Sequence, residues 1–152
     1  MNWPEYFRAI AHTVKLKSKD WHTQIGVAIV GKDNEIVSTG YNSFPRGIDD
    51  YRLERQERPE KYFWMMHAEQ NAIVNAARIG VSTKGCTMYM TCGMPCADCA
   101  KAIINAGIEK IVIEPNGTGS GAKDGIWTEH GLRSITMFIE AGMTIEYYGD
   151  KS

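Results

Sequence analysis

Two short clusters in this sequence carry residue types that bind metal ions and transfer protons. The first is a His-x-Glu triplet that begins at His67, and the second is a Cys-x-x-Cys pair formed by Cys96 and Cys99. Imidazole and thiolate groups are ligands that Zn²⁺ prefers, and a zinc site with three protein ligands leaves the fourth position for water. Glu69 is placed to move protons to and from that water. The clusters therefore predict a hydrolytic zinc site.

Both clusters are expected at the first turn of a helix. Cys96 and Cys99 are three residues apart, so their thiols lie on one helix face. Pro95 suits a helix entry, and the positive end of the helix dipole favours thiolates. In mid-helix His67 and Glu69 would diverge by about 200°. In a frayed first turn both can reach one site, with Glu69 offset from the metal as a proton carrier.

Three other interpretations of these residues stay open. The cysteine pair could be a thioredoxin-like redox pair, although His67 and Glu69 have no part in that chemistry. A structural zinc site would need a fourth protein ligand, for which Cys92 is the best candidate. The cysteines could also be buried core residues without a metal. The other histidines have no ligand partners at useful spacing and are expected at the surface: His12, His22 and His130.

Composition indicates an ordinary globular protein. With 152 residues, 43% hydrophobic and 23% charged, the chain is expected to form one domain over residues 1–152 with a full core. A net charge of −1 makes a nucleic-acid partner unlikely, because polynucleotide binders usually carry a basic face. No apolar run approaches the roughly 18 residues of a membrane span. The first residues do not resemble a signal peptide, so we expect a cytoplasmic protein with reduced cysteines.

Helices and strands that must position the clusters are expected to alternate along the chain. Helices are predicted near residues 2–17, 66–79, 97–106 and 127–141, and strands near residues 25–30, 35–41, 86–91, 108–113 and 143–148. The first two strands should pair as an antiparallel hairpin. Alternation of strands and helices after this hairpin predicts an α/β fold with a mixed sheet covered on both faces.

Two connections stand out by their length or composition. Residues 42–63 form a connection of a length that is more often functional than idle, and its charge run from Arg52 to Lys61 is expected to be solvated surface. Residues 114–125 are rich in glycine and are expected to form a mobile loop. They lack the spacing of phosphate-binding glycine motifs.

Five segments occur along the chain in this order: Ser18-Lys19-Asp20, Gln24-Ile25-Gly26, Gly40–Gly47, His67–Ile73 and Pro95–Lys101. In order and spacing, over roughly residues 5–113, they resemble the deoxycytidylate (dCMP) deaminase family of the cytidine-deaminase-like superfamily. The H-x-E and P-C-x-x-C motifs are common to zinc-dependent deaminases. The G-Y-N-x-x-P-x-G loop and the long connection before His67 favour the nucleotide branch, because transfer RNA adenosine deaminases have a much shorter connection there.

This resemblance implies a three-layer α/β/α fold with a five-stranded mixed sheet, and the conversion of dCMP and water to dUMP and ammonia. Zn²⁺ held by His67, Cys96 and Cys99 would supply hydroxide, and Glu69 would transfer the protons. The resemblance also implies a homo-oligomer, either a dimer or a hexamer, and effector control by dCTP and dTTP. Ser43 and the 114–125 loop depart from the family's pattern, which leaves that control open.

Four further residues are candidates for substrate contacts. The resemblance implies that Asn42 contacts the nucleotide, since its amide can donate and accept hydrogen bonds. The backbone N–H of Ala68 is expected to bind the polar edge of the base. The monophosphate needs cations, and Lys19 and Arg46 are the candidates, although either could be an ordinary surface residue.

Two other functions compete with dCMP deamination. One is the same chemistry on modified dCMP, cytidine, guanine or an RNA adenosine. The other is a non-catalytic zinc-binding regulatory module. The presence of Glu69 favours an enzyme, because a structural zinc site has no use for that carboxylate.

Overall fold

Helices and strands alternate along most of the chain, as the sequence predicted. The computed structural model describes residues 1–123 and 126–150. In chain order the elements are α1 (Trp3–Val14), the 3₁₀ turn η1 (Lys15–Lys17), β1 (Gly26–Val30), β2 (Ile36–Tyr41), α2 (Leu53–Gln56), α3 (Lys61–Trp64), α4 (Ala68–Ile79), β3 (Thr87–Met90), α5 (Ala97–Asn105), β4 (Lys110–Ile113), β5 (Ala122–Lys123), β6 (Ile126–Trp127), α6 (Glu129–Glu140) and β7 (Thr144–Tyr147). The short elements α3, β5 and β6 were not predicted.

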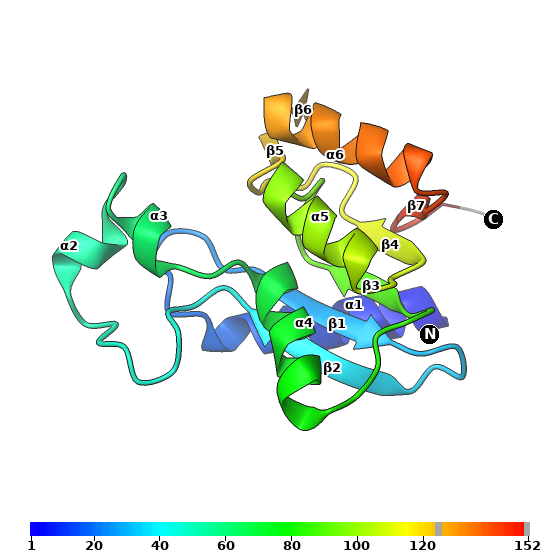
Figure 1. The fold of residues 1–152 in the computed structure, drawn as a ribbon, viewed down its shortest axis with the longest axis horizontal. Helices are drawn as coiled ribbons and strands as arrows, with labels where there is room; N and C mark the ends of the chain where they lie inside the picture. The colour runs from blue at the N-terminus through cyan, green and yellow to red at the C-terminus, as the bar shows by residue number, and fades with distance from the viewer. Residues whose placement is uncertain (124–125, 151–152) are drawn as a thin grey trace.

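The main sheet has five strands in the order β2-β1-β3-β4-β7. Strand β1 pairs antiparallel with β2, which confirms the predicted hairpin, and antiparallel with β3. Strands β3, β4 and β7 are parallel to one another. Helices α4, α5 and α6 cover one face of the sheet and α1 covers the other (Figure 1). The predicted mixed sheet in a three-layer α/β/α arrangement is therefore confirmed.

Strand β1 is buried on both faces, which explains its continuous apolar sequence. Val27 and Ile29 belong to the core between the sheet and helices α4, α5 and α6. Ala28 and Val30 belong to the core beneath α1. The core therefore lies on both sides of the central strands, and it fixes α4 and α5 against one face.

The start of α4 is held close to β2 by a glycine. A Cβ atom on Gly40 would lie 2.4 Å from the Ala72 nitrogen and 2.6 Å from the Ala68 carbonyl oxygen. The side chain of Ser38, also on β2, donates a hydrogen bond of 2.7 Å to the Ala72 carbonyl. Helix α4 ends as predicted at Gly80, which adopts a left-handed conformation with φ 86°. These contacts set the position of the first turn of α4, where His67 and Glu69 lie.

Helices α2 and α3 lie in the connection between β2 and α4, which we call the insertion (residues 42–66). They lie to one side of the sheet (Figure 1, left). The prediction that this charge run is solvated surface is wrong at Gln56 and Lys61, because both side chains are buried. Their partners lie in the segment before β1, far away in the sequence.

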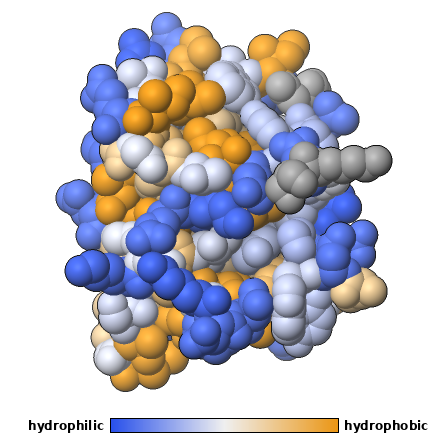
Figure 2. All heavy atoms as spheres, turned by 90° about the vertical axis from the view of Figure 1, so that its right-hand side faces the viewer, coloured by the Kyte–Doolittle hydropathy of each residue, from blue (hydrophilic) through white to orange (hydrophobic). Residues whose placement is uncertain are grey.

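The surface mixes polar and apolar side chains. Figure 2 shows the side that lies to the right in Figure 1, where hydrophobic patches are separated by hydrophilic residues. None of the helices in the described ranges has the length and apolar character that a membrane span requires.

Candidate active site

Helices α4 and α5 begin next to each other, and their first residues bring the three predicted zinc ligands together. His67 is the N-cap residue of α4 and Cys96 is the N-cap residue of α5, both with extended backbones. The Nδ1 atom of His67 lies 3.1 Å from the Cys99 Sγ and 3.6 Å from the Cys96 Sγ. The ligand atoms of the three residues all lie within 4.8 Å of one another.

These separations fit a zinc ion. Two ligands held at 2.0–2.3 Å by a tetrahedral ion lie about 3.5 Å apart, close to both of the observed distances from His67. Over residues 1–123 and 126–150, this is the one group of three or more side chains arranged to bind a metal. Cys92 lines the same cavity but does not belong to the group, so the geometry does not favour a structural site with four protein ligands.

The charges of the cluster also suit a cation. The hydrogen bond from the Cys99 thiol lowers the pKa of Cys96 to about 4, and the hydrogen bond from His67 acts in the same direction. The pKa of Cys99 is raised, because its thiol donates to Cys96 and is buried. The hydrogen bond to Cys96 raises the pKa of His67. The lowered pKa favours the thiolate form of Cys96, which suits a cation ligand. None of the four cysteines, all of which the structure describes, forms a disulfide.

Glu69 lies beside this group without joining it. Its side chain is 4% exposed in the first turn of α4, and it lines the same cavity as the three candidate ligands. Burial raises the pKa of the Glu69 carboxyl, against the opposing effect of His67. A buried carboxyl next to a ligand group is suited to accepting and returning a proton.

The cavity above the cluster measures about 750 Å³, a size typical of small-molecule sites. Its lining combines the starts of α4, α5 and α6 with the insertion and with the segment 118–123. We expected this glycine-rich segment to be a mobile loop and not a phosphate-binding motif. In the structure Ser120 Oγ lies 3.5 Å from the Nε2 atom of His67. His130, expected at the surface, is exposed and also lines the cavity, and its Nδ1 accepts a hydrogen bond of 3.2 Å from the Ala97 N–H.

Asn42 and Ala68, which the sequence suggested as substrate contacts, both line the cavity. The Asn42 amide, however, already has partners within the protein. Its Oδ1 accepts hydrogen bonds from the Ser18 hydroxyl (2.7 Å) and the Ile25 N–H (2.8 Å), and its Nδ2 donates to the Thr23 carbonyl (2.7 Å). In this structure the amide of Asn42 therefore holds the segment before β1 as a wall of the cavity.

The structure brings neither predicted phosphate-binding cation into the cavity lining. Lys19 is exposed, and its backbone carbonyl is held by the Gln56 amide at 2.8 Å. Arg46 donates a hydrogen bond of 2.9 Å to Asn75 and lines a separate hollow beside β2 and α4.

Sequence reasoning missed the buried ion pair that connects the insertion to the cavity wall. Lys61 Nζ lies 2.7 Å from Asp20 Oδ2, with side chains that are 7% and 3% exposed. Burial alone would raise the pKa of Asp20, but the hydrogen bonds from Lys61 and from the N–H groups of His22 and Thr23 outweigh it, so the pKa lies below its usual value. No local signal marks this pair, because its members are separated by a hairpin and a long connection.

Residues 1–114 match the family model described as the cytidine and deoxycytidylate deaminase zinc-binding region. The chain belongs to this family. The match covers both metal-binding clusters and the whole insertion, and it ends where the cavity-lining loop begins.

Known members of the cytidine and deoxycytidylate deaminase family support this assignment. Human deoxycytidylate deaminase is 42% identical over 117 residues, which cover 74% of this chain and 64% of the human protein. The chain thus spans less than two thirds of that relative's length. An uncharacterised deaminase from Aliivibrio fischeri is 37% identical over 145 residues, covering 95% of this chain and 92% of that protein. The crystal structure of dCMP deaminase from the cyanophage S-TIM5 in complex with dCMP and dUMP superposes with a TM-score of 0.73, at 25% identity over 94% of both chains. The fold is therefore cytidine-deaminase-like, as predicted.

Proposed function

We propose that this protein is a zinc-dependent hydrolytic deaminase that converts dCMP to dUMP and ammonia. The observation that carries this proposal is the set of three metal-ligating side chains with a buried carboxyl beside them in one cavity. Support for the substrate comes from the human relative, a deoxycytidylate deaminase, and from the cyanophage enzyme bound to dCMP and dUMP.

His67, Cys96 and Cys99 would hold the zinc ion, since their ligand atoms are gathered at the joint start of α4 and α5. When bound, zinc supplies a water molecule that is acidic enough to act as a nucleophile at neutral pH. Two helix N-termini point their partial positive charge at the thiolates and stabilise them. The protein therefore provides the charge and the geometry of the site before any substrate arrives.

Glu69 would carry the protons of the reaction. Its carboxylate accepts a proton from the attacking water and delivers it to a ring nitrogen of cytosine. The carboxylate then takes the remaining proton of the hydroxyl group added to the ring carbon and delivers it to the amine, and the carbon–nitrogen bond breaks to release ammonia. Its buried position next to the ligand group keeps it close to both the nucleophile and the leaving group.

The base would be oriented by backbone groups. The first N–H groups of a helix have no partner within the helix, and Ala68 is the first residue of α4. Its N–H is available to the polar edge of the pyrimidine. Asn42 stays a predicted nucleotide contact, and we assign it the additional role of holding the cavity wall through Ser18 and Thr23.

Several properties implied by the resemblance stay predictions for this chain. They are a single domain over residues 1–152, assembly into a homodimer or hexamer, control by dCTP or dTTP, and a cytoplasmic location. Deamination of another base and a non-catalytic zinc module are the competing functions. The buried Glu69 favours the enzyme over the module, because a carboxyl is costly to bury and a structural zinc site has no use for one outside its ligand set.

The test is ammonia release by the zinc-loaded protein from dCMP, deoxycytidine, CMP and guanine, together with the zinc content. We expect one zinc ion per chain and turnover that is fastest on dCMP. The Cys99→Ala variant should lose the zinc. Turnover of guanine or CMP in preference to dCMP would reassign the substrate, and zinc-bound protein that is inactive on all four would contradict the proposal.

A further inference from the structure

The cavity has a buried metal end and an open rim, and the rim carries cations that the metal end does not use. His67, Cys96 and Glu69 line the metal end. Arg58, in the turn between α2 and α3, and Lys123, in β5, line the same cavity with exposed side chains. A ligand whose base reaches the metal would extend its other end toward this rim.

Most of the other charges in the lining are already neutralised. Lys61 is paired with Asp20 at 2.7 Å, and Asp98 is paired with Lys101 at 2.9 Å. By contrast, no ion pair of Arg58 or Lys123 is found in the part of the chain that the structure describes. Among the residues that the structure describes, these two cations therefore add positive charge to the rim without an ion-pair partner.

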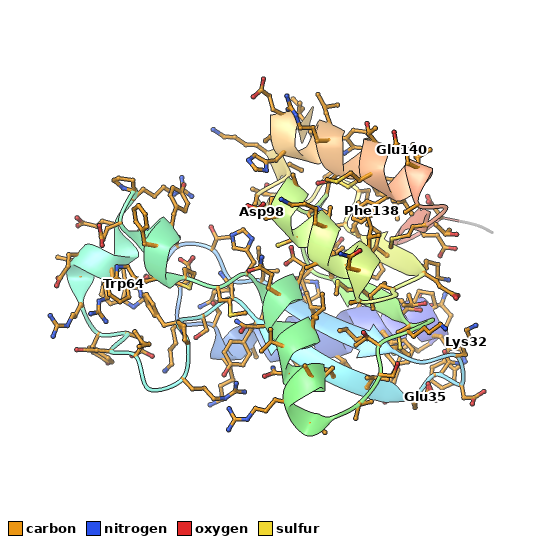
Figure 3. All side chains as sticks on the ribbon, in the orientation of Figure 1. Lys32, Glu35, Trp64, Asp98, Phe138 and Glu140 are labelled. Carbon is orange, nitrogen blue, oxygen red and sulfur yellow. The ribbon has the colours of Figure 1, made fainter. Side chains whose placement is uncertain are left out.

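The location of the two cations favours a ligand held between them. Arg58 comes from the insertion and its guanidinium lies 5.8 Å from the centre of the Tyr62 ring. Lys123 comes from the opposite side, next to the start of α6. In Figure 3 the labelled Trp64, on α3, marks the side of the insertion, and the labelled Asp98, at the start of α5, marks the opposite side. The N-termini of α4, α5 and α6 all contribute residues to the lining, and their dipoles add to the positive potential of the cavity.

We infer that Arg58 and Lys123 bind the phosphate of a nucleoside monophosphate whose base lies at the metal end. This inference rests on the proposed function and specifies how the substrate class is selected. A guanidinium binds two phosphate oxygens at once, and an ammonium adds a point charge. Lys123 lies beyond residue 114, where the match to the family model ends. Lys61 is excluded as the phosphate ligand because Asp20 uses its charge.

The experiment compares kcat/KM for dCMP and for deoxycytidine in Arg58→Gln, Lys123→Gln and the double variant. Arg133→Gln and Lys84→Gln are matched controls, since both residues are exposed and lie outside the cavity lining. A lost charge-assisted hydrogen bond lowers the value for dCMP by roughly 10- to 100-fold. We expect this loss in each single variant, a larger one in the double variant, and little change for deoxycytidine. The controls should keep the wild-type ratio of the two substrates.

The outcomes separate this inference from the proposed function. If wild-type protein prefers dCMP and the double variant keeps that preference, or loses both substrates equally, the phosphate assignment is wrong while the deaminase proposal stands. If wild-type protein deaminates neither substrate, the proposed function fails. Calorimetric binding of dUMP and deoxyuridine then decides the phosphate assignment. Tighter binding of dUMP that disappears in the double variant supports it, and equal binding of the two ligands overturns it.

Discussion

The metal end of the cavity and its rim are built in different ways. The metal end comes from the first residues of two long helices, α4 and α5, which pack on the central strands. The rim comes from the insertion and the segment 118–123, which lie outside the five-stranded sheet. The core of the protein therefore fixes the reactive groups. The segments to which we assign substrate selection lie outside this core, and they can vary without disturbing the core.

The insertion is held by buried polar side chains. Besides the Asp20–Lys61 pair, the Gln56 amide donates to the Lys19 carbonyl at 2.8 Å and accepts from the Trp21 N–H at 3.2 Å. All of these contacts join the insertion to the segment before β1. Substitutions there should therefore change the rim and leave the metal end intact, which the following predictions test.

The largest effect is expected at the metal end, in Glu69→Gln. The amide has nearly the same shape but cannot accept and return a proton, so turnover should fall by roughly 10²- to 10⁴-fold. The zinc content and the thermal stability should stay close to those of the wild type, since Glu69 is not a member of the ligand group. Ammonia release and metal analysis on the same sample check this, and wild-type turnover would remove Glu69 from the mechanism.

A second prediction concerns the ion pair that holds the insertion. Lys61→Met leaves the Asp20 carboxylate buried without its partner, which should lower the free energy of unfolding by about 3–5 kcal/mol. Adding Asp20→Asn should restore part of this loss, because the unpaired charge is then removed. Chemical denaturation of the single and double variants measures both effects. Lys101→Met is the control, since its pair with Asp98 is exposed and should matter little.

The same variants test whether the two regions are independent. Lys61→Met should bind zinc as the wild type does, while its KM for dCMP rises, because the insertion that carries Arg58 is no longer held in place. Loss of zinc in this variant would show that the rim and the metal end unfold together.

A third prediction follows from the lowered pKa of Asp20. A carboxyl whose pKa is lower in the folded protein adds stability above its unfolded pKa of about 3.9, and this stability is lost as the pH falls through the folded value. The difference in unfolding free energy between wild type and Asp20→Asn should therefore be constant near neutral pH and shrink below about pH 4. Urea titrations of both proteins over this range measure the difference. A gap that grows on acidification would contradict the role of the ion pair.

The grouping of residues at the metal end could be predicted from the sequence, because these residues lie in two short motifs at helix starts. His67, Cys96, Cys99 and Glu69 lie where the spacing and the helix rules placed them. The strands were equally accessible, because their apolar runs must fill a two-sided core. The rim could not be predicted in the same way. Whether a charged residue points into the cavity depends on the path of the insertion, which is set by partners such as Asp20 that lie far away in the sequence.

The smallest effect is expected for Arg46, which the sequence suggested as a phosphate ligand. Its guanidinium donates to the Asn75 side chain on α4, and Asn75 keeps a second hydrogen bond, to the Thr39 carbonyl at 2.9 Å. Arg46→Ala therefore removes one exposed contact, and the free energy of unfolding should change by at most about 0.5 kcal/mol. The ratio of kcat/KM values for dCMP and deoxycytidine should stay at the wild-type level, in contrast to Arg58→Gln. A selective loss of dCMP turnover in Arg46→Ala would place the phosphate on the side of α4 and β2, and the division between metal end and rim would have to be redrawn.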